Sequence, residues 1–168
     1  TATPYHYNHD SITPRYYQRI AINRVVEAVA KGEDRILLVM ATGTGKTYTA
    51  FQIVWRLREA GLKKKVLYLA DRNVLLDQTI SGDFKPLNAV TTKVKQRKLD
   101  SAYEVFFSSY QQLVNDADEG PQPFEQFSRD FFDLVIVDEC HRGSVKADSS
   151  QKTSLHLTTS ANLYILTH

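Results

Sequence analysis

The residues of this sequence best suited to chemistry form one short loop, which reads Thr42, Gly43, Thr44, Gly45, Lys46 and Thr47. The two glycines allow backbone angles, and a close approach to a ligand, that any side chain would block. Lys46 can bridge the outer phosphates of a nucleotide, and the Thr47 hydroxyl can bind magnesium. Successive backbone N–H groups in such a turn point inward and attract anions. The loop therefore predicts a site for a nucleoside triphosphate with Mg²⁺.

The segments on either side of the loop agree with a phosphate-binding turn. An apolar run from Ile36 to Met40 predicts a strand before it, and residues 46–60 predict a helix after it. The positive amino-terminal end of that helix would face the phosphates. Met40 occupies the position at which the strict eight-residue pattern has its first glycine, so the match is looser than the full pattern. A glycine-rich turn with a chance lysine is the alternative, and the flanking elements disfavour it.

A second set of reactive side chains follows another apolar run, from Leu134 to Val137. Asp138 and Glu139 come directly after it, and active sites of parallel sheets lie beyond the carboxyl ends of the strands. We expect Asp138 to hold the magnesium ion through water, and Glu139 to orient or deprotonate the water that attacks the terminal phosphate. For His141 two interpretations stay open: it couples the nucleotide site to a neighbouring domain, or it has no such role.

Polar residues also occupy three other places that a ligand can reach. At the start of a helix predicted to run from Arg15 to Ala30, the Gln18 amide can read the edge of adenine while a guanidinium or an aromatic ring stacks on the base. Arg72 and the segment from Ser109 to Gln111 follow two further predicted strands, residues 66–70 and 105–107. Their side chains suit phosphates of a nucleic acid, and turn or helix-capping chemistry is the open alternative.

The order of the predicted elements is typical of βαβ units, with a short helix at 74–78 and a strand at 89–94 completing the series. It predicts an α/β fold, a P-loop NTPase with a doubly wound parallel sheet and helices on both faces. Residues 1–14 are expected to be a linker or the cut end of an upstream domain, and residues 15–144 the ATP-binding domain. Residues 145–168 form an atypical, incomplete segment, for which a terminal strand and a tail altered by truncation both stay open.

Composition narrows the class of protein. A chain of 168 residues with 42% hydrophobic residues can bury the core of one domain. Its single cysteine, Cys140, excludes an internal disulfide framework, and we find neither a signal peptide nor a run that could span a bilayer. We therefore expect a cytoplasmic protein without a membrane partner. The net charge of +2 is too small to indicate nucleic-acid binding by itself.

Five motifs follow one another in a particular order: Arg15-Tyr-Tyr-Gln18, Met40-Ala-Thr-Gly-Thr-Gly-Lys-Thr47, Ala70-Asp-Arg-Asn73, Ser108-Ser-Tyr-Gln111 and Asp138-Glu-Cys-His141. This order resembles a superfamily 2 helicase motor. The residues around the motifs, "RILLVMATGTGKTYTAFQIVWRL", "LYLADRNVLLDQT" and "VDECHRGS", are more specifically similar to the motor (R, or restriction) subunit of type I restriction enzymes. The resemblance covers about residues 14–144, and five motifs in order are far more specific than one.

The resemblance implies that the chain is the first of two RecA-like motor domains, in a protein that pumps DNA past itself with ATP and cleaves it. A nuclease domain would precede the motor, and methyltransferase and specificity subunits would complete the complex. It also implies roles for single residues: adenine recognition by Arg15 and Gln18, MgATP handling by Lys46, Thr47, Asp138 and Glu139, contacts to double-stranded DNA by Arg72, Ser109, Tyr110 and Gln111, and coupling by His141.

Two other functions stay open. The chain could be a stand-alone superfamily 2 DNA helicase domain, or a catalytically inactive remnant that binds nucleotide, which the missing second motor domain favours. We find no carboxylate and lysine constellation of a nuclease within the 168 residues. Because a second domain would have to supply the arginine that stabilises the transferred phosphate, we expect the chain alone to hydrolyse little ATP.

Overall fold

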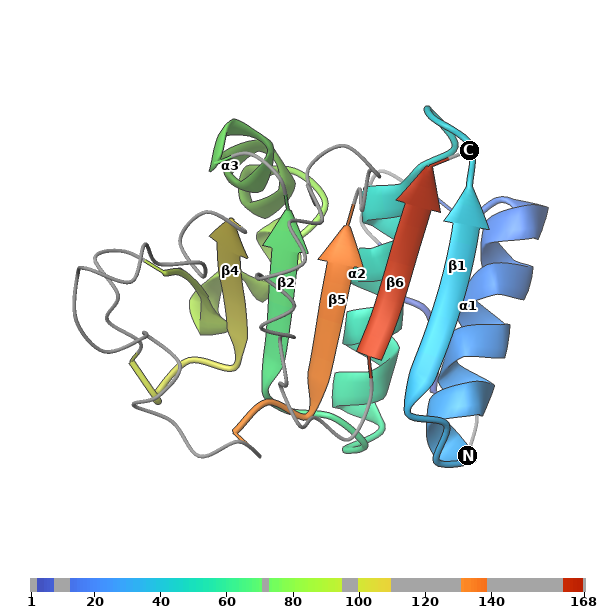
Figure 1. The fold of residues 1–168 in the computed structure, drawn as a ribbon, viewed down its shortest axis with the longest axis horizontal. Helices are drawn as coiled ribbons and strands as arrows, with labels where there is room; N and C mark the ends of the chain where they lie inside the picture. The colour runs from blue at the N-terminus through green and yellow to red at the C-terminus, as the bar shows by residue number, and fades with distance from the viewer. Residues whose placement is uncertain are drawn as a thin grey trace, which may run out of the picture.

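A computed structural model describes residues 3–7, 13–70, 73–94, 100–109, 131–138 and 162–167. Its strands form a parallel six-stranded sheet in the order β1-β6-β5-β2-β4-β3 (Figure 1). The strands are β1 (Arg35–Met40), β2 (Val66–Ala70), β3 (Thr91–Lys93), β4 (Val105–Ser109), β5 (Leu134–Asp138) and β6 (Asn162–Thr167). The helices are α1 (Tyr16–Ala30), α2 (Lys46–Glu59), α3 (Asn73–Ser81) and the 3₁₀ helix η1 (Lys85–Val90). Since the strands run in one direction, their carboxyl ends meet at one edge of the sheet.

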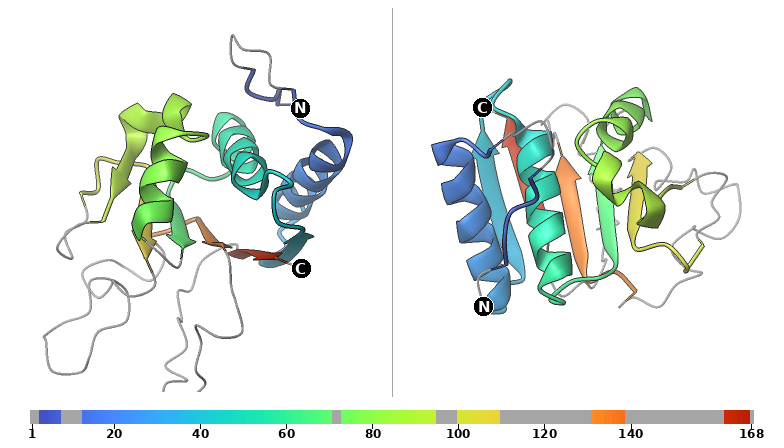
Figure 2. Two further views of the ribbon diagram at one scale, coloured as in Figure 1. Left: turned by 90° about the horizontal axis from the view of Figure 1, so that it is seen from above. Right: turned by 180° about the vertical axis from the view of Figure 1, so that it is seen from behind.

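Helices α1, α2 and α3 lie on the same face of the sheet, as the view from above in Figure 2 shows. The main core fills the space between them and the strands. In α2 the buried apolar residues include Phe51, Val54 and Leu57, which recur every three residues and so line one side of the helix. They belong to the same cluster as Tyr68 and Phe107, which alternate along their strands with residues of the opposite face.

The α/β parallel sheet predicted from the sequence is confirmed, and the differences are local. The strand expected at 89–94 is shorter, because Pro86 stands near the start of a 3₁₀ turn that continues to Val90. Helix α3 is longer at both ends than the 74–78 expected, and β4 continues two residues beyond Phe107. Within the C-terminal segment, residues 162–167 form a strand. The described helices lie on one face of the sheet, and the helices expected on its other face are not among the residues that the structure describes.

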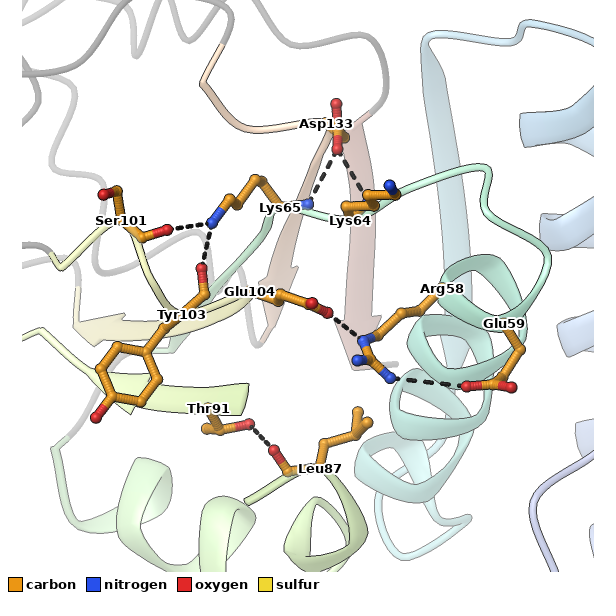
Figure 3. A network of polar contacts seen from close by, with 10 residues as sticks. All are labelled: Arg58, Glu59, Lys64, Lys65, Leu87, Thr91, Ser101, Tyr103, Glu104 and Asp133. Atoms are coloured by element: carbon orange, nitrogen blue, oxygen red, sulfur yellow. Dashed lines mark hydrogen bonds and ion pairs between the residues drawn. The ribbon is translucent and has the colours of Figure 1, made fainter. Parts of the chain in front are cut away.

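A network of polar contacts fixes the amino-terminal end of the sheet, opposite the edge that carries the motifs (Figure 3). The Asp133 carboxylate, just before β5, accepts the backbone N–H groups of Lys64 and Lys65 at 2.9 and 3.0 Å. The Lys65 ammonium donates to two carbonyl oxygens ahead of β4. Arg58, in the last turn of α2, is paired with Glu104. These contacts hold α2 at its carboxyl end, so that its amino end is directed at the opposite edge.

Residues 3–7, within the segment expected to be a linker or cut end, pack along α2. The Gln52 amide accepts the backbone N–H of His6 at 3.0 Å and donates to its carbonyl oxygen at 2.9 Å. The Arg56 guanidinium donates to the Thr3 carbonyl oxygen and lies over the ring of Tyr5. Both α2 side chains are buried, so this segment is part of the packed structure.

Candidate functional site

The predicted phosphate loop joins β1 to α2 at the carboxyl edge of the sheet. Gly43 and Gly45 have φ angles of 75° and 79°, in the left-handed region that favours glycine. The backbone N–H and the hydroxyl of Thr44 both donate to the Ala41 carbonyl oxygen, at 3.3 and 2.6 Å, and close the turn. Helix α2 then begins at Lys46 and carries no acidic residue in its first turn. Its positive amino-terminal end is therefore suited to an anion.

Gln18 ties the start of α1 to this loop. Its Oε1 accepts the backbone N–H of Arg15 at 2.8 Å, and its Nε2 donates to the Thr44 carbonyl oxygen at 2.9 Å. The side chain is 6% exposed, and a Cβ added at Gly45 would lie 2.5 Å from its Nε2. A side chain at position 45 would therefore strain the backbone and displace the Gln18 amide.

A cavity of about 240 Å³ adjoins the loop on the side of α1, lined by Tyr17, Ala21, Leu38, Val39, Met40, Ala41 and Thr44. The Tyr17 hydroxyl donates to the Thr44 carbonyl oxygen at 3.3 Å and accepts from the Arg15 guanidinium at 3.3 Å. Arg15 and Tyr17 are both exposed. The predicted arginine, aromatic and glutamine cluster thus meets the phosphate loop next to a largely apolar hollow.

A second cavity, of about 300 Å³, lies on the other side of the loop and is lined by Lys46, Thr47, Ala70, Gln78, Thr79, Gly82, Asp83 and Asp138. Lys46 and Thr47 come from the first turn of α2, and Asp138 is the last residue of β5. The structure therefore brings together the lysine, the hydroxyl and the carboxylate that the sequence placed in one site.

A buried tyrosine holds one of these residues. The Tyr68 hydroxyl, in β2, donates to Asp138 Oδ2 at 2.5 Å. Tyr68 is 0% exposed and Asp138 8%. Burial, reinforced by the negative charge of Asp138, raises the pKa of Tyr68 well above its ordinary value of 10.0. The phenol is therefore protonated at neutral pH and acts as a donor.

The sequence reasoning missed Tyr68 and Asp83. Tyr68 is the one polar side chain in the strand Val66–Ala70, and a lone hydroxyl in a buried apolar strand is a signal that could have identified it. Asp83 lines the cavity of Lys46, and burial raises the pKa of its carboxyl above the ordinary 3.8. It lies in the turn after α3, and no motif or spacing in the sequence marks it.

The residues present fit a magnesium ion. Mg²⁺ prefers oxygen ligands and keeps several water molecules, so one or two protein oxygens beside the phosphates are sufficient. Thr47 and Asp138 supply a hydroxyl and a carboxylate on one cavity. Among the described residues there is no cluster of three or more histidine, cysteine, aspartate or glutamate side chains, as a softer or more fully caged metal would need.

Several predicted site residues, Arg72, Tyr110, Gln111, Glu139 and His141, lie outside the described residues. Ser109 ends β4 and is 1% exposed, so a contact between its hydroxyl and DNA stays a prediction. No helix in the described part of the chain has the length and apolar character needed to cross a bilayer.

The sequence of this chain is similar to those of restriction-enzyme subunits. A family described as "Type III restriction enzyme, res subunit" matches residues 11–165. The endonuclease subunit of the type I restriction enzyme EcoAI, from Escherichia coli, is 52% identical over 155 residues, which make up 92% of this chain and 19% of that subunit. The chain thus spans about a fifth of the length of this relative. The resemblance to type I subunits that the motifs predicted is confirmed.

Solved structures with the same fold include two proteins in complex with DNA. A nuclease-deletion mutant of the Type ISP restriction-modification enzyme LlaGI, in complex with a DNA substrate mimic, superposes with a TM-score of 0.64 at 24% identity, over 91% of this chain and 17% of that one. The Sulfolobus solfataricus SWI2/SNF2 ATPase core in complex with dsDNA gives a TM-score of 0.70 at 16% identity, over 99% of this chain and 34% of that one. At these identities the likeness concerns the fold alone, which is RecA-like.

Proposed function

Since the chain belongs to the family described as the res subunit of type III restriction enzymes, we propose that it is the ATP-binding half of a DNA-dependent ATPase and translocase. The relative at 52% identity favours an R subunit of a type I restriction endonuclease as the parent protein. In that protein, ATP-driven movement of DNA is coupled to cleavage by a nuclease domain elsewhere. The proposal rests on one observation: Lys46, Thr47 and Asp138 line the same cavity at the edge of the sheet.

The chemical roles follow from the types of side chain and their places. The loop N–H groups and Lys46 hold the β- and γ-phosphates, because a helix amino terminus and an ammonium group both attract anions. Thr47 and Asp138 hold the magnesium ion, Asp138 through water. The ion, when bound, neutralises the charge that develops on the phosphate oxygens. Glu139, next in sequence, orients the attacking water or accepts its proton.

Adenine binds beside α1, in contact with Arg15 and Gln18. The Gln18 amide has two N–H groups and two acceptor lone pairs on its oxygen, and the contacts to Thr44 and Arg15 use one of each. One donor and one acceptor remain, which match the N7 acceptor and the N6 amino group of adenine. The cavity beside Tyr17 supplies an apolar wall next to this amide.

Double-stranded DNA is the proposed substrate of translocation. DNA accompanies the LlaGI and SWI2/SNF2 structures. In this chain Arg72 follows β2 in the sequence, and Ser109 ends β4 with Tyr110 and Gln111 next in the sequence. We assign these four residues to DNA contacts and His141 to coupling between motor domains. The second RecA-like domain, and methyltransferase and specificity subunits, are the proposed partners in a cytoplasmic complex.

The test compares Lys46→Ala with the unchanged full-length protein that carries this chain, and with Lys31→Ala as the control. Lys31 is an exposed lysine at the far end of α1, so its loss removes one positive charge outside the site. A charge-assisted hydrogen bond contributes about 1.5–3 kcal/mol, so Lys46→Ala should weaken binding of a fluorescent ATP analogue by about tenfold to 150-fold.

DNA-stimulated ATP hydrolysis is measured on the same samples. Lys46→Ala should abolish it and Lys31→Ala should leave it unchanged. Equal binding and hydrolysis in the three proteins would contradict a nucleotide site at this loop. Hydrolysis that does not respond to duplex DNA would contradict the translocase and leave an ATPase that DNA does not stimulate.

A further inference from the structure

Tyr68 occupies a place in the sheet from which it can reach the carboxylate of the neighbouring strand. It pairs in register with Ile136 of β5, and Asp138 follows Ile136 by two residues. Side chains two residues apart in a strand point to the same face, so Asp138 stands on the face of Tyr68, one step nearer the site. Both side chains point to the face covered by α2, whose first turn carries Thr47.

The tyrosine ring is held rigidly. Its centroid lies 5.0 Å from that of Phe107 and 5.6 Å from that of Phe84, and the side chain is fully buried. Packing of this kind leaves one rotamer, so the hydroxyl has a fixed position between β5 and α2. The hydroxyl is the only polar group that β2 contributes to the core.

The direction of the hydrogen bond follows from the chemistry of the groups. An ionised carboxylate only accepts, so the Tyr68 proton is directed to Asp138 Oδ2. A carboxylate held through one oxygen by a rigid donor has its orientation fixed, and groups that orient metal ligands in this way tune the metal site.

We propose that Tyr68 is a positioning residue for the magnesium site, whose hydroxyl holds the Asp138 carboxylate and sets its orientation at the cavity that Thr47 also lines. The inference rests on the proposed function, because it takes Thr47 and Asp138 as the residues that hold Mg²⁺. Tyr68 itself touches neither nucleotide nor metal. It acts by fixing the carboxylate of the neighbouring strand in one orientation.

The test uses Tyr68→Phe, which removes the hydroxyl and keeps the ring. Tyr103→Phe is the matched control, since Tyr103 is a partly buried tyrosine packed at the opposite end of the sheet. Binding of Mn²⁺ to the full protein with an ATP analogue is followed by electron paramagnetic resonance, and Mg²⁺ is titrated against a fluorescent ATP analogue. Removal of a group that orients a metal ligand costs about 10–100-fold in metal affinity. We expect a loss of at least about tenfold for Tyr68→Phe and none for Tyr103→Phe.

Two additional measurements separate positioning from general support of the fold. Binding of the analogue in the presence of a chelator should be the same in Tyr68→Phe and the unchanged protein, because the phosphate loop is intact. Substitution of Tyr68 by p-aminophenylalanine keeps a donor at the same place on the ring and should restore most of the metal affinity. This variant also decides the question if Tyr68→Phe fails to fold.

Metal affinity equal to that of the control variant would overturn the inference, even if Tyr68→Phe unfolds at a lower temperature. The inference would also be overturned if the p-aminophenylalanine variant bound the metal no more tightly than Tyr68→Phe. If Tyr68→Phe does not fold, a metal affinity of the p-aminophenylalanine variant below that of the unchanged protein would overturn it. Absence of any nucleotide binding by the unchanged protein would be a different result, because it would remove the proposed function on which the inference depends.

Discussion

Replacing Gly45 by alanine tests whether the phosphate loop and Gln18 fit together as described. The added Cβ would lie 2.5 Å from Gln18 Nε2, and the backbone at this position has a φ of 79°. At Gly43 the φ angle is 75°, and nothing lies within 4 Å of the added Cβ. The two alanine variants therefore share the backbone cost and differ in the contact with Gln18.

The expected magnitudes follow from these two terms. The left-handed conformation costs an alanine about 1–2 kcal/mol, which is the expected loss in the free energy of unfolding for Gly43→Ala. Gly45→Ala also displaces the Gln18 amide from the Arg15 N–H and the Thr44 carbonyl oxygen. Each lost hydrogen bond costs about 1 kcal/mol, so the total for Gly45→Ala is about 3–4 kcal/mol. In a Gln18→Ala background the added Cβ meets no amide, and Gly45→Ala should cost about as much as Gly43→Ala.

The assay is urea denaturation of the full chain, followed by the fluorescence of its single tryptophan, Trp55. Trp55 lies in α2, in contact with the rings of His6 and Phe51, and so reports on the helix that follows the loop. Equal losses of stability for the two alanine variants would refute the close approach of Gln18 to Gly45. An excess cost of Gly45→Ala that persists without the Gln18 side chain would refute it too.

Two other predictions concern the amino-terminal segment and the missing domain. Burial lowers the pKa of His6 below its ordinary 6.5, so the folded state favours the neutral ring, and the stability that His6 contributes is lost as the pH falls from 6.5 toward the lower folded pKa. Nuclear magnetic resonance titration of the ring measures this pKa, and a value of 6.5 or more would contradict its burial against Trp55. Under the proposed function, an arginine of the second RecA-like domain stabilises the transferred phosphate, so residues 1–168 alone should hydrolyse ATP about 10³–10⁵ times more slowly than the full-length protein with DNA. Turnover assays with and without duplex DNA check this, and comparable rates would contradict the dependence on that domain.

The parts of the fold that the sequence predicted best are those in which local pattern and chemistry agree. An apolar run followed by glycines and a lysine has few alternatives, so β1, the loop and the start of α2 were placed to within about one residue. The strand before Asp138 was equally clear, since an all-apolar run of four residues suits a strand buried on both faces. Lys46, Thr47 and Asp138 could be assigned to one site because parallel strands end at a common edge.

Other features depend on tertiary contacts that a pattern does not contain. Gln18 was expected to contact the adenine base. In the structure its amide donates to the carbonyl oxygen of Thr44, which lies in the phosphate loop, far from α1 in the sequence. Tyr68 became visible as part of the site only once β2 and β5 were seen to be neighbours. The 3₁₀ helix before β3 is another such case. Valine favours strands, but Val90 is the last residue of the 3₁₀ helix that begins at Lys85.

The pairing of β1 has a consequence for the order in which the domain assembles. At the edge of the described sheet, β1 pairs with β6, so that Arg35 lies next to Asn162, far along the sequence. During synthesis the loop sequence emerges long before the strand that joins β1 to β5 and hence to Asp138. Closure of so long a chain segment is entropically costly and makes folding slow. The lysine and the carboxylate of the site therefore acquire their final separation late, when β6 inserts between β1, which leads into the phosphate loop, and β5, which ends at Asp138.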